Sequence, residues 1–89
     1  MPESKVKIIN KLGIHARPAS MIVELCSKYD GDIKLEANGM HADAKSILSI
    51  MMLAAEKGTA VKISVNGTSD DEGVLNRLNE MFEKGFGEE

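Results

Sequence analysis

Residues 13–19 read Gly-Ile-His-Ala-Arg-Pro-Ala, and this stretch decides where the first helix of the fold begins. Gly13 permits a tight bend after the preceding strand. Pro18 is tolerated only in the first turn of a helix, because its missing N–H would have no intrahelical partner there. An apolar pattern with helical spacing starts at Ala19. We therefore expect His15 at or next to the N-cap of a helix.

The residues at this helix start suit an anion. The backbone N–H groups of Ala16 and Arg17 have no intrahelical partner, and a helix N-terminus attracts negative charge. The Arg17 guanidinium can donate two hydrogen bonds to phosphate oxygens. Imidazole is a nucleophile that is largely uncharged near neutral pH. The pattern favours His15 as a phosphoryl acceptor, although a histidine at a helix start is more often a capping or solvated residue.

Residues 13–19 resemble the active-site motif of the HPr family, the phosphocarriers of the bacterial phosphoenolpyruvate-dependent phosphotransferase system. A second block, Ala44-Lys45-Ser46-Ile47-Leu48, resembles the regulatory seryl site of that family and the start of its second helix. The two motifs have the separation found in the family, and the resemblance spans nearly the whole chain.

The resemblance implies a carrier that acts as a covalent intermediate, not an enzyme. Enzyme I, charged from phosphoenolpyruvate, would donate a phosphoryl group to Nδ1 of His15. Arg17 and the backbone N–H of Ala16 would stabilise that group, and a IIA protein or domain would accept it for sugar uptake. The family needs no cofactor and no metal for this. An alternative is a regulatory phosphocarrier of the nitrogen branch (NPr-type), which the run Asn10-Lys11-Leu12-Gly13 and the ending Gly85-Phe86 resemble more closely.

The resemblance also implies a docking surface on the second helix for enzyme I and the IIA proteins. Carried over by position, its residues are Ile47, Leu48 and Met51, with Ser20 on the first helix. Ser46 is explained plainly as a helix N-cap. In some bacteria, however, the family serine is phosphorylated by an ATP-dependent HPr kinase/phosphorylase, which makes Ser46 a candidate phosphoserine.

Three positions depart from the family pattern. Leu12 stands where the family often has Asn or Ser, which helps to orient the histidine ring, and a leucine cannot form that hydrogen bond. Ser49 stands where Gly is frequent, and Leu48 stands where Met is common.

Length, composition and charge limit the classes of protein to which the chain can belong. The 89 residues predict a single domain over 1–89, with 43% hydrophobic and 28% charged residues and a net charge of −3. The absence of a Lys/Arg run argues against nucleic-acid binding. The sequence shows no signal peptide and no apolar run near the ~20 residues of a membrane helix, so we expect a cytoplasmic protein without membrane insertion. We also expect a monomer. Cys26, the only cysteine, lies on the apolar stripe of the first expected helix, and we interpret it as an inert core thiol.

Hydrophobic periodicity predicts four strands and three helices. Asn38-Gly39 is a strong hairpin signal, Ser46 is expected to cap the second helix, and Ser69-x-x-Glu72 reads as a capping box. The tail 87–89 is expected to fray. The expected strands are 5–9, 32–37, 40–43 and 60–66, and the expected helices are 16–29, 47–55 and 70–84.

This order predicts an α+β fold, βαββαβα, in which every strand alternates and three helices cover one face of an antiparallel sheet. The family resemblance adds the description open-faced β-sandwich and the strand order 1-4-2-3. A ferredoxin-like binding module is the rival architecture. It would need sheet aromatics and basic charge for RNA, or paired cysteines for a metal, and the chain has neither. His41, on the expected edge strand, lacks metal-ligand spacing.

Overall fold

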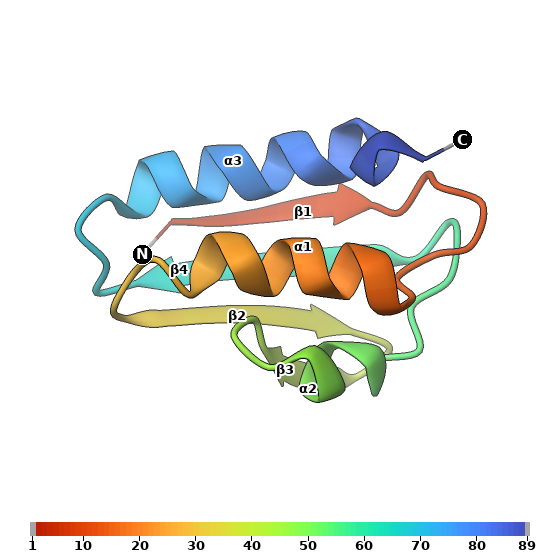
Figure 1. The fold of residues 1–89 in the computed structure, drawn as a ribbon, viewed down its shortest axis with the longest axis horizontal. Coiled ribbons are helices and arrows are strands. Elements are labelled where there is room, and N and C mark those ends of the chain that lie inside the picture. Colours follow the sequence, from red (N-terminus) through yellow and green to blue (C-terminus); the bar gives the residue numbers. More distant parts are fainter. Residues whose placement is uncertain (1, 89) are drawn as a thin grey trace.

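The computed structural model describes residues 2–88, which form a four-stranded antiparallel sheet in the order β1-β4-β2-β3. Helices α1 and α3 lie side by side across one face of this sheet, and α2 lies beside β3 at one edge (Figure 1). The predicted open-faced α+β fold and its strand order are confirmed. The strands are β1 (Glu3–Lys7), β2 (Asp32–Ala37), β3 (Met40–Asp43) and β4 (Ala60–Asn66). The helices are α1 (Ala16–Cys26), α2 (Ile47–Met51), α3 (Asp71–Glu83) and the 3₁₀ turn η1 (Gly85–Gly87).

The two central strands supply the sheet's side of the core. Along β2 and β4 every second side chain is buried, as the alternation in the sequence predicts. Cross-strand partners on the covered face stand opposite one another, with Leu35 paired to Ile63 and Ile33 paired to Val65. These side chains pack against the apolar stripes of α1 and α3, so the sheet has one covered face and one polar face.

The first strand and the first helix differ in their bounds from the expected ones. β1 spans Glu3–Lys7 and not 5–9, because its partner β4 begins at Ala60, opposite Lys7. Ile8 remains buried, and its N–H donates to the carbonyl of Thr59 beyond the ladder. α1 ends at Cys26 and not near residue 29, because the chain then tightens into turns in which an N–H bonds the carbonyl three residues back.

The other two helices also begin or end away from the expected residues. α2 stops at Met51 and not near residue 55, since Ala54 adopts a left-handed φ of 51° that cannot continue a helix. The predicted capping box at Ser69 was wrong. Asp70 is the N-cap of α3, and its Oδ1 accepts from the N–H of Gly73 at 3.1 Å.

Gly13 positions the loop that carries His15. Its φ is +69°, and a Cβ built there would lie 2.5 Å from the carbonyl oxygen of Ala55. The next residue, Ile14, donates its N–H to that same oxygen at 2.9 Å. The loop before α1 is therefore fixed against the segment after α2, and only glycine allows so close an approach.

Candidate functional site

His15 is the N-cap of α1, as predicted. Its backbone is extended (φ −98°, ψ −167°), and its side chain makes no capping hydrogen bond and is 35% exposed. The backbone N–H groups of Ala16 and Arg17 have no hydrogen-bond partner within residues 2–88. Nearby donors of this kind at a helix N-terminus favour a negatively charged group. The structure thus places His15 beside the open end of a helix.

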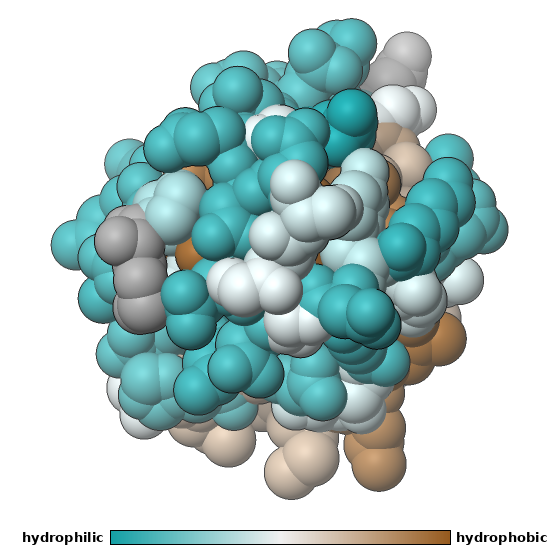
Figure 2. All heavy atoms as spheres, turned by 90° about the vertical axis from the view of Figure 1, so that its left-hand side faces the viewer, coloured by the Kyte–Doolittle hydropathy of each residue, from teal (hydrophilic) through white to brown (hydrophobic). Residues whose placement is uncertain are grey.

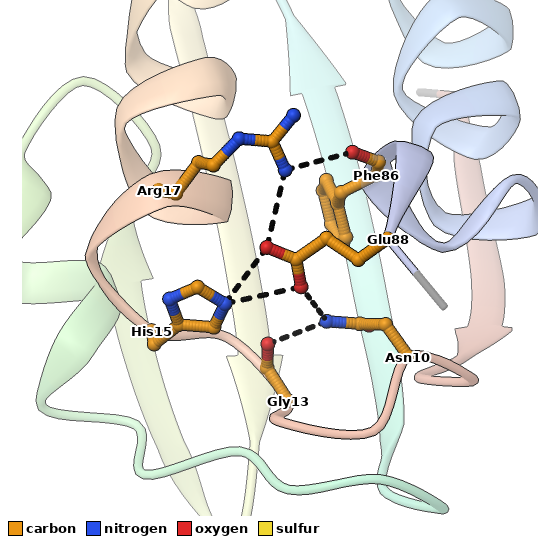
Figure 3. A network of polar contacts seen from close by, with 6 residues as sticks. All are labelled: Asn10, Gly13, His15, Arg17, Phe86 and Glu88. Carbon is orange, nitrogen blue, oxygen red and sulfur yellow. Dashed lines mark hydrogen bonds and ion pairs between the residues drawn. The ribbon is translucent and has the colours of Figure 1, made fainter.

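The ring of His15 faces the C-terminal end of the chain. Its Nε2 lies 2.9 Å from Oε2 and 3.0 Å from Oε1 of Glu88 (Figure 3). The Arg17 guanidinium donates to Oε2 of the same carboxylate at 3.1 Å and to the carbonyl of Phe86 at 3.2 Å. His15 and Arg17 are therefore brought together, as expected, but through a carboxylate that the sequence analysis did not assign to the site.

Asn10 completes this network from the turn before α1. Its side chain is buried, and its Nδ2 donates to the carbonyl of Gly13 at 2.7 Å and to Oε1 of Glu88 at 3.0 Å. Both partners are acceptors, which fixes the orientation of the amide. Asn10 therefore ties the turn that carries His15 to the chain's end (Figure 3).

Phe86 explains why Glu88 is held in place. It is 2% exposed, and its ring packs edge-to-face on Phe82 with centroids 4.9 Å apart. The N–H of Glu88 then donates to the carbonyl of Gly85 at 2.9 Å. The expectation that the tail frays was wrong for residues 87 and 88, because a buried aromatic anchors it; residue 89 lies outside the described residues.

The surroundings of Glu88 favour its ionised form. Hydrogen bonding from His15 is the largest cause that lowers the pKa of Glu88 below its ordinary value, and Asn10 and Arg17 lower it further. Partial burial acts in the opposite direction without cancelling this effect. The carboxylate thus brings a negative charge to the ring of His15.

The second predicted motif lies on α2. Ser46 is its N-cap, as predicted, and its Oγ accepts from the N–H of Ser49 at 3.2 Å. Ser20, on the exposed side of α1, belongs to a helix that packs against α2. We call the exposed apolar side chains of α2 and its C-cap the α2 patch; they are Ile47, Leu48, Met51 and Met52.

The end of the molecule remote from His15 has a different character. Figure 2 shows it as mainly hydrophilic, with hydrophobic residues along its lower edge, at the height of α2 and β3 in Figure 1.

His41 is exposed on β3, with Nε2 3.8 Å from Oε2 of Glu36. Residues 2–88 contain no group of three or more His, Cys, Asp or Glu side chains arranged to hold a metal.

Cys26 lies in the core, on the buried stripe of α1. Burial raises the pKa of this thiol to about 12, with a smaller opposing effect from Lys45. A thiol that stays protonated is a poor nucleophile. The interpretation of Cys26 as a packed core residue agrees with this environment.

A family model described as "PTS HPr component phosphorylation site" matches residues 2–84. The chain belongs to the HPr family. The phosphocarrier protein HPr of Xylella fastidiosa (strain Temecula1) is 36% identical over 89 residues, which cover 100% of this chain and 99% of the relative.

Solved HPr structures share the fold closely. HPr-C-His from Thermoanaerobacter tengcongensis has a TM-score of 0.91 and 40% identity, covering 100% of this chain and 99% of that one. An HPr dimer from the same organism has a TM-score of 0.75 and 40% identity, covering 99% and 100%. This HPr-family chain has, within its described residues, no helix long and apolar enough to cross a membrane.

Two residues of the site were missed by sequence reasoning. Asn10 was noted only in the run Asn10-Lys11-Leu12-Gly13 that resembles the nitrogen branch, and Glu88 was assigned to the frayed tail. The available signal was Phe86, an aromatic residue placed after the helix-ending Gly85, which indicates a buried anchor in the tail. No local pattern in the sequence indicates that Glu88 contacts His15.

Proposed function

We propose that this HPr-family chain accepts a phosphoryl group from phospho-enzyme I on Nδ1 of His15 and passes it to a IIA protein or domain for sugar uptake. The observation that carries the proposal is the position of His15. Its partly exposed imidazole stands at the N-cap of α1, next to the Arg17 guanidinium and two backbone N–H groups that have no partner within residues 2–88. The family match covers the same residues.

The transfer is an in-line displacement at phosphorus. The lone pair of Nδ1 attacks the phosphorus atom carried by phospho-enzyme I, the new N–P bond forms, and the donor atom of enzyme I leaves with the electron pair of the bond that breaks. The N–H groups of Ala16 and Arg17 then donate to the phosphoryl oxygens. Arg17 contributes the N–H donors of its guanidinium that are not used on Glu88 and Phe86. Positioning and charge stabilisation do the chemical work.

Docking to donor and acceptor uses the α2 patch together with Ser20. Four exposed apolar side chains on one short segment suit a protein partner, and Leu48 is 72% exposed. One surface must serve enzyme I and the IIA protein in turn, so the contact is small and transient. Ser46 lies at the start of this patch, where phosphorylation by an HPr kinase/phosphorylase would add roughly −1.5 to −2 charges and weaken docking.

The chain acts as one phosphocarrier domain over 1–89, as a monomer in the cytoplasm. A monomer leaves the α2 patch accessible to both partners. A dimer has been solved for HPr of Thermoanaerobacter tengcongensis. Light scattering at the working concentration should give the mass of a monomer for this chain.

The test is labelling from radioactive phosphoenolpyruvate with purified enzyme I. We expect one phosphoryl group per chain, labile in acid and stable in base. His15→Ala should abolish the label, and His41→Ala, the matched control on the exposed strand β3, should leave it unchanged. A label that persists in His15→Ala would contradict the proposal.

A further inference from the structure

The two ring nitrogens of His15 have different surroundings. Nε2 contacts both carboxylate oxygens of Glu88, whereas Nδ1 has no hydrogen-bond partner within residues 2–88. Figure 3 shows Nδ1 on the side of the ring that faces away from Glu88. The two nitrogens are thus distinguished by a contact that comes from the end of the chain.

We propose that Glu88 is a positioning residue for His15, which holds the ring proton on Nε2 and leaves the lone pair on Nδ1. This inference rests on the proposed function, since it states how the accepting nitrogen is chosen. A neutral imidazole has one N–H donor and one acceptor nitrogen, and an ionised carboxylate only accepts. The nitrogen that faces Glu88 is therefore the one that carries the proton.

Glu88 is itself fixed in this role. Its side chain is 16% exposed, and Asn10 and Arg17 each donate to one of its oxygens. The lowered pKa of Glu88 keeps the carboxylate charged at neutral pH. Asn10 and Arg17 direct these N–H groups at the carboxylate, and within residues 2–88 neither side chain forms a hydrogen bond with the ring itself. The network thus orients the ring as well as its proton.

The carboxylate also opposes the charge that the transfer creates. When Nδ1 forms its bond to phosphorus, the proton on Nε2 stays in place and the ring gains a positive charge. The donor atom of enzyme I takes the electron pair of the bond that breaks, so no further co-reactant is needed. A carboxylate 2.9 Å from Nε2 stabilises the charged ring, as an acidic residue does for a catalytic imidazole.

The side chain of Leu12, in the turn before α1, does not take part in orienting the His15 ring. Leu12 is 73% exposed, and its side chain has no hydrogen-bonding group, so that side chain cannot orient the ring by a hydrogen bond. Glu88 and Asn10 are the side chains that the structure brings to this task, one in contact with the ring and one in contact with the carboxylate.

The test begins with the unphosphorylated protein, labelled with ¹⁵N, at about pH 8, where an ordinary imidazole is neutral. Proton–nitrogen correlation spectra report which ring nitrogen carries the proton and how fast that proton exchanges with water. His41 is the internal reference for an exposed ring. The variants are Glu88→Ala, Glu88→Gln and the matched control Glu83→Ala, on the exposed side of α3.

Wild type and Glu83→Ala should show an exchange-protected Nε2–H at His15. Glu88→Ala should lose that protection, and its ring nitrogens should shift toward those of His41. Its transfer rate from phospho-enzyme I should fall about 10-fold, the scale expected for loss of an orienting group. Glu88→Gln, which keeps an acceptor but loses the charge, should lie between wild type and Glu88→Ala in both measurements.

Two results would overturn the inference: unchanged ring signals of His15 in Glu88→Ala, or an unchanged transfer rate. The ring spectra do not depend on phosphorylation. If wild type showed the protected Nε2–H but took no label from enzyme I, the proposed function would fail while the contact itself stood.

Discussion

The carboxylate of Glu88 lies 2.9 Å from Nε2 of His15, although 73 positions separate the two residues in the chain. The contact joins the N-cap of α1 to the turn that follows α3. It gives the candidate site an acidic partner in addition to the cation Arg17.

The contribution of Glu88 to stability should depend on pH. The pKa of Glu88 is lower in the folded protein than in the unfolded chain. Its contribution to the free energy of unfolding is therefore complete above the ordinary glutamate pKa of about 4.3, and it is lost as the pH falls through the pKa of the folded protein. The free energies of unfolding of wild type and Glu88→Ala, measured in urea, should therefore differ at neutral pH and become equal in acid. A difference in free energy of unfolding that stays constant down to acid pH would contradict this prediction. Glu83→Ala serves as the control.

Arg17→Ala should slow phosphoryl transfer several-fold, because a positioned cation near developing charge is lost. The effect should appear in the rate of the transfer step measured by rapid quench. Arg77→Ala is the matched control, since Arg77 is an exposed arginine whose NH1 donates to the hydroxyl of Tyr29 at 2.9 Å. Equal rates for the two variants would remove Arg17 from the mechanism.

Ser46→Asp should weaken docking more than folding. Aspartate is as good an N-cap as serine, so the free energy of unfolding should change by less than about 1 kcal/mol. Its charge beside the α2 patch should lower the affinity for enzyme I, measured by calorimetry, several-fold. Ser69→Asp, in the exposed loop before α3, is the control. Equal affinities would leave Ser46 as a cap and nothing more.

Cys26 should be unreactive in the folded protein. The pKa of its thiol rises from 9.0 to about 12 on folding, so the unfolded chain ionises first and stability should fall as the pH rises between these values. At about pH 8, a thiol-specific disulfide reagent should react with the native protein far more slowly than with the protein in urea. Comparable rates in the two states would contradict the buried environment.

The elements that the sequence predicts well are those fixed by local chemistry. The alternating burial of β2 and β4 follows directly from their hydrophobic pattern. The hairpin follows from Asn38 and Gly39, whose φ values of 53° and 76° are the left-handed ones that such a turn requires. Ser46 caps α2 through its own hydroxyl.

The elements that the sequence predicts poorly depend on contacts between distant segments. β1 lies two residues earlier than its alternation suggests because its pairing with β4 sets the register. The tail is ordered because Phe86 finds Phe82 in the core. At the site, the motif of residues 13–19 identifies His15 and Arg17, but Glu88 reaches them only through the folding of the whole chain.

The most direct test of the central claim is to determine which nitrogen carries the phosphoryl group. Protein labelled with ¹⁵N, phosphorylated by enzyme I and phosphoenolpyruvate, should show phosphorus coupled to Nδ1 of His15, with the proton retained on Nε2. Phosphorus on Nε2, or on His41, would contradict the account.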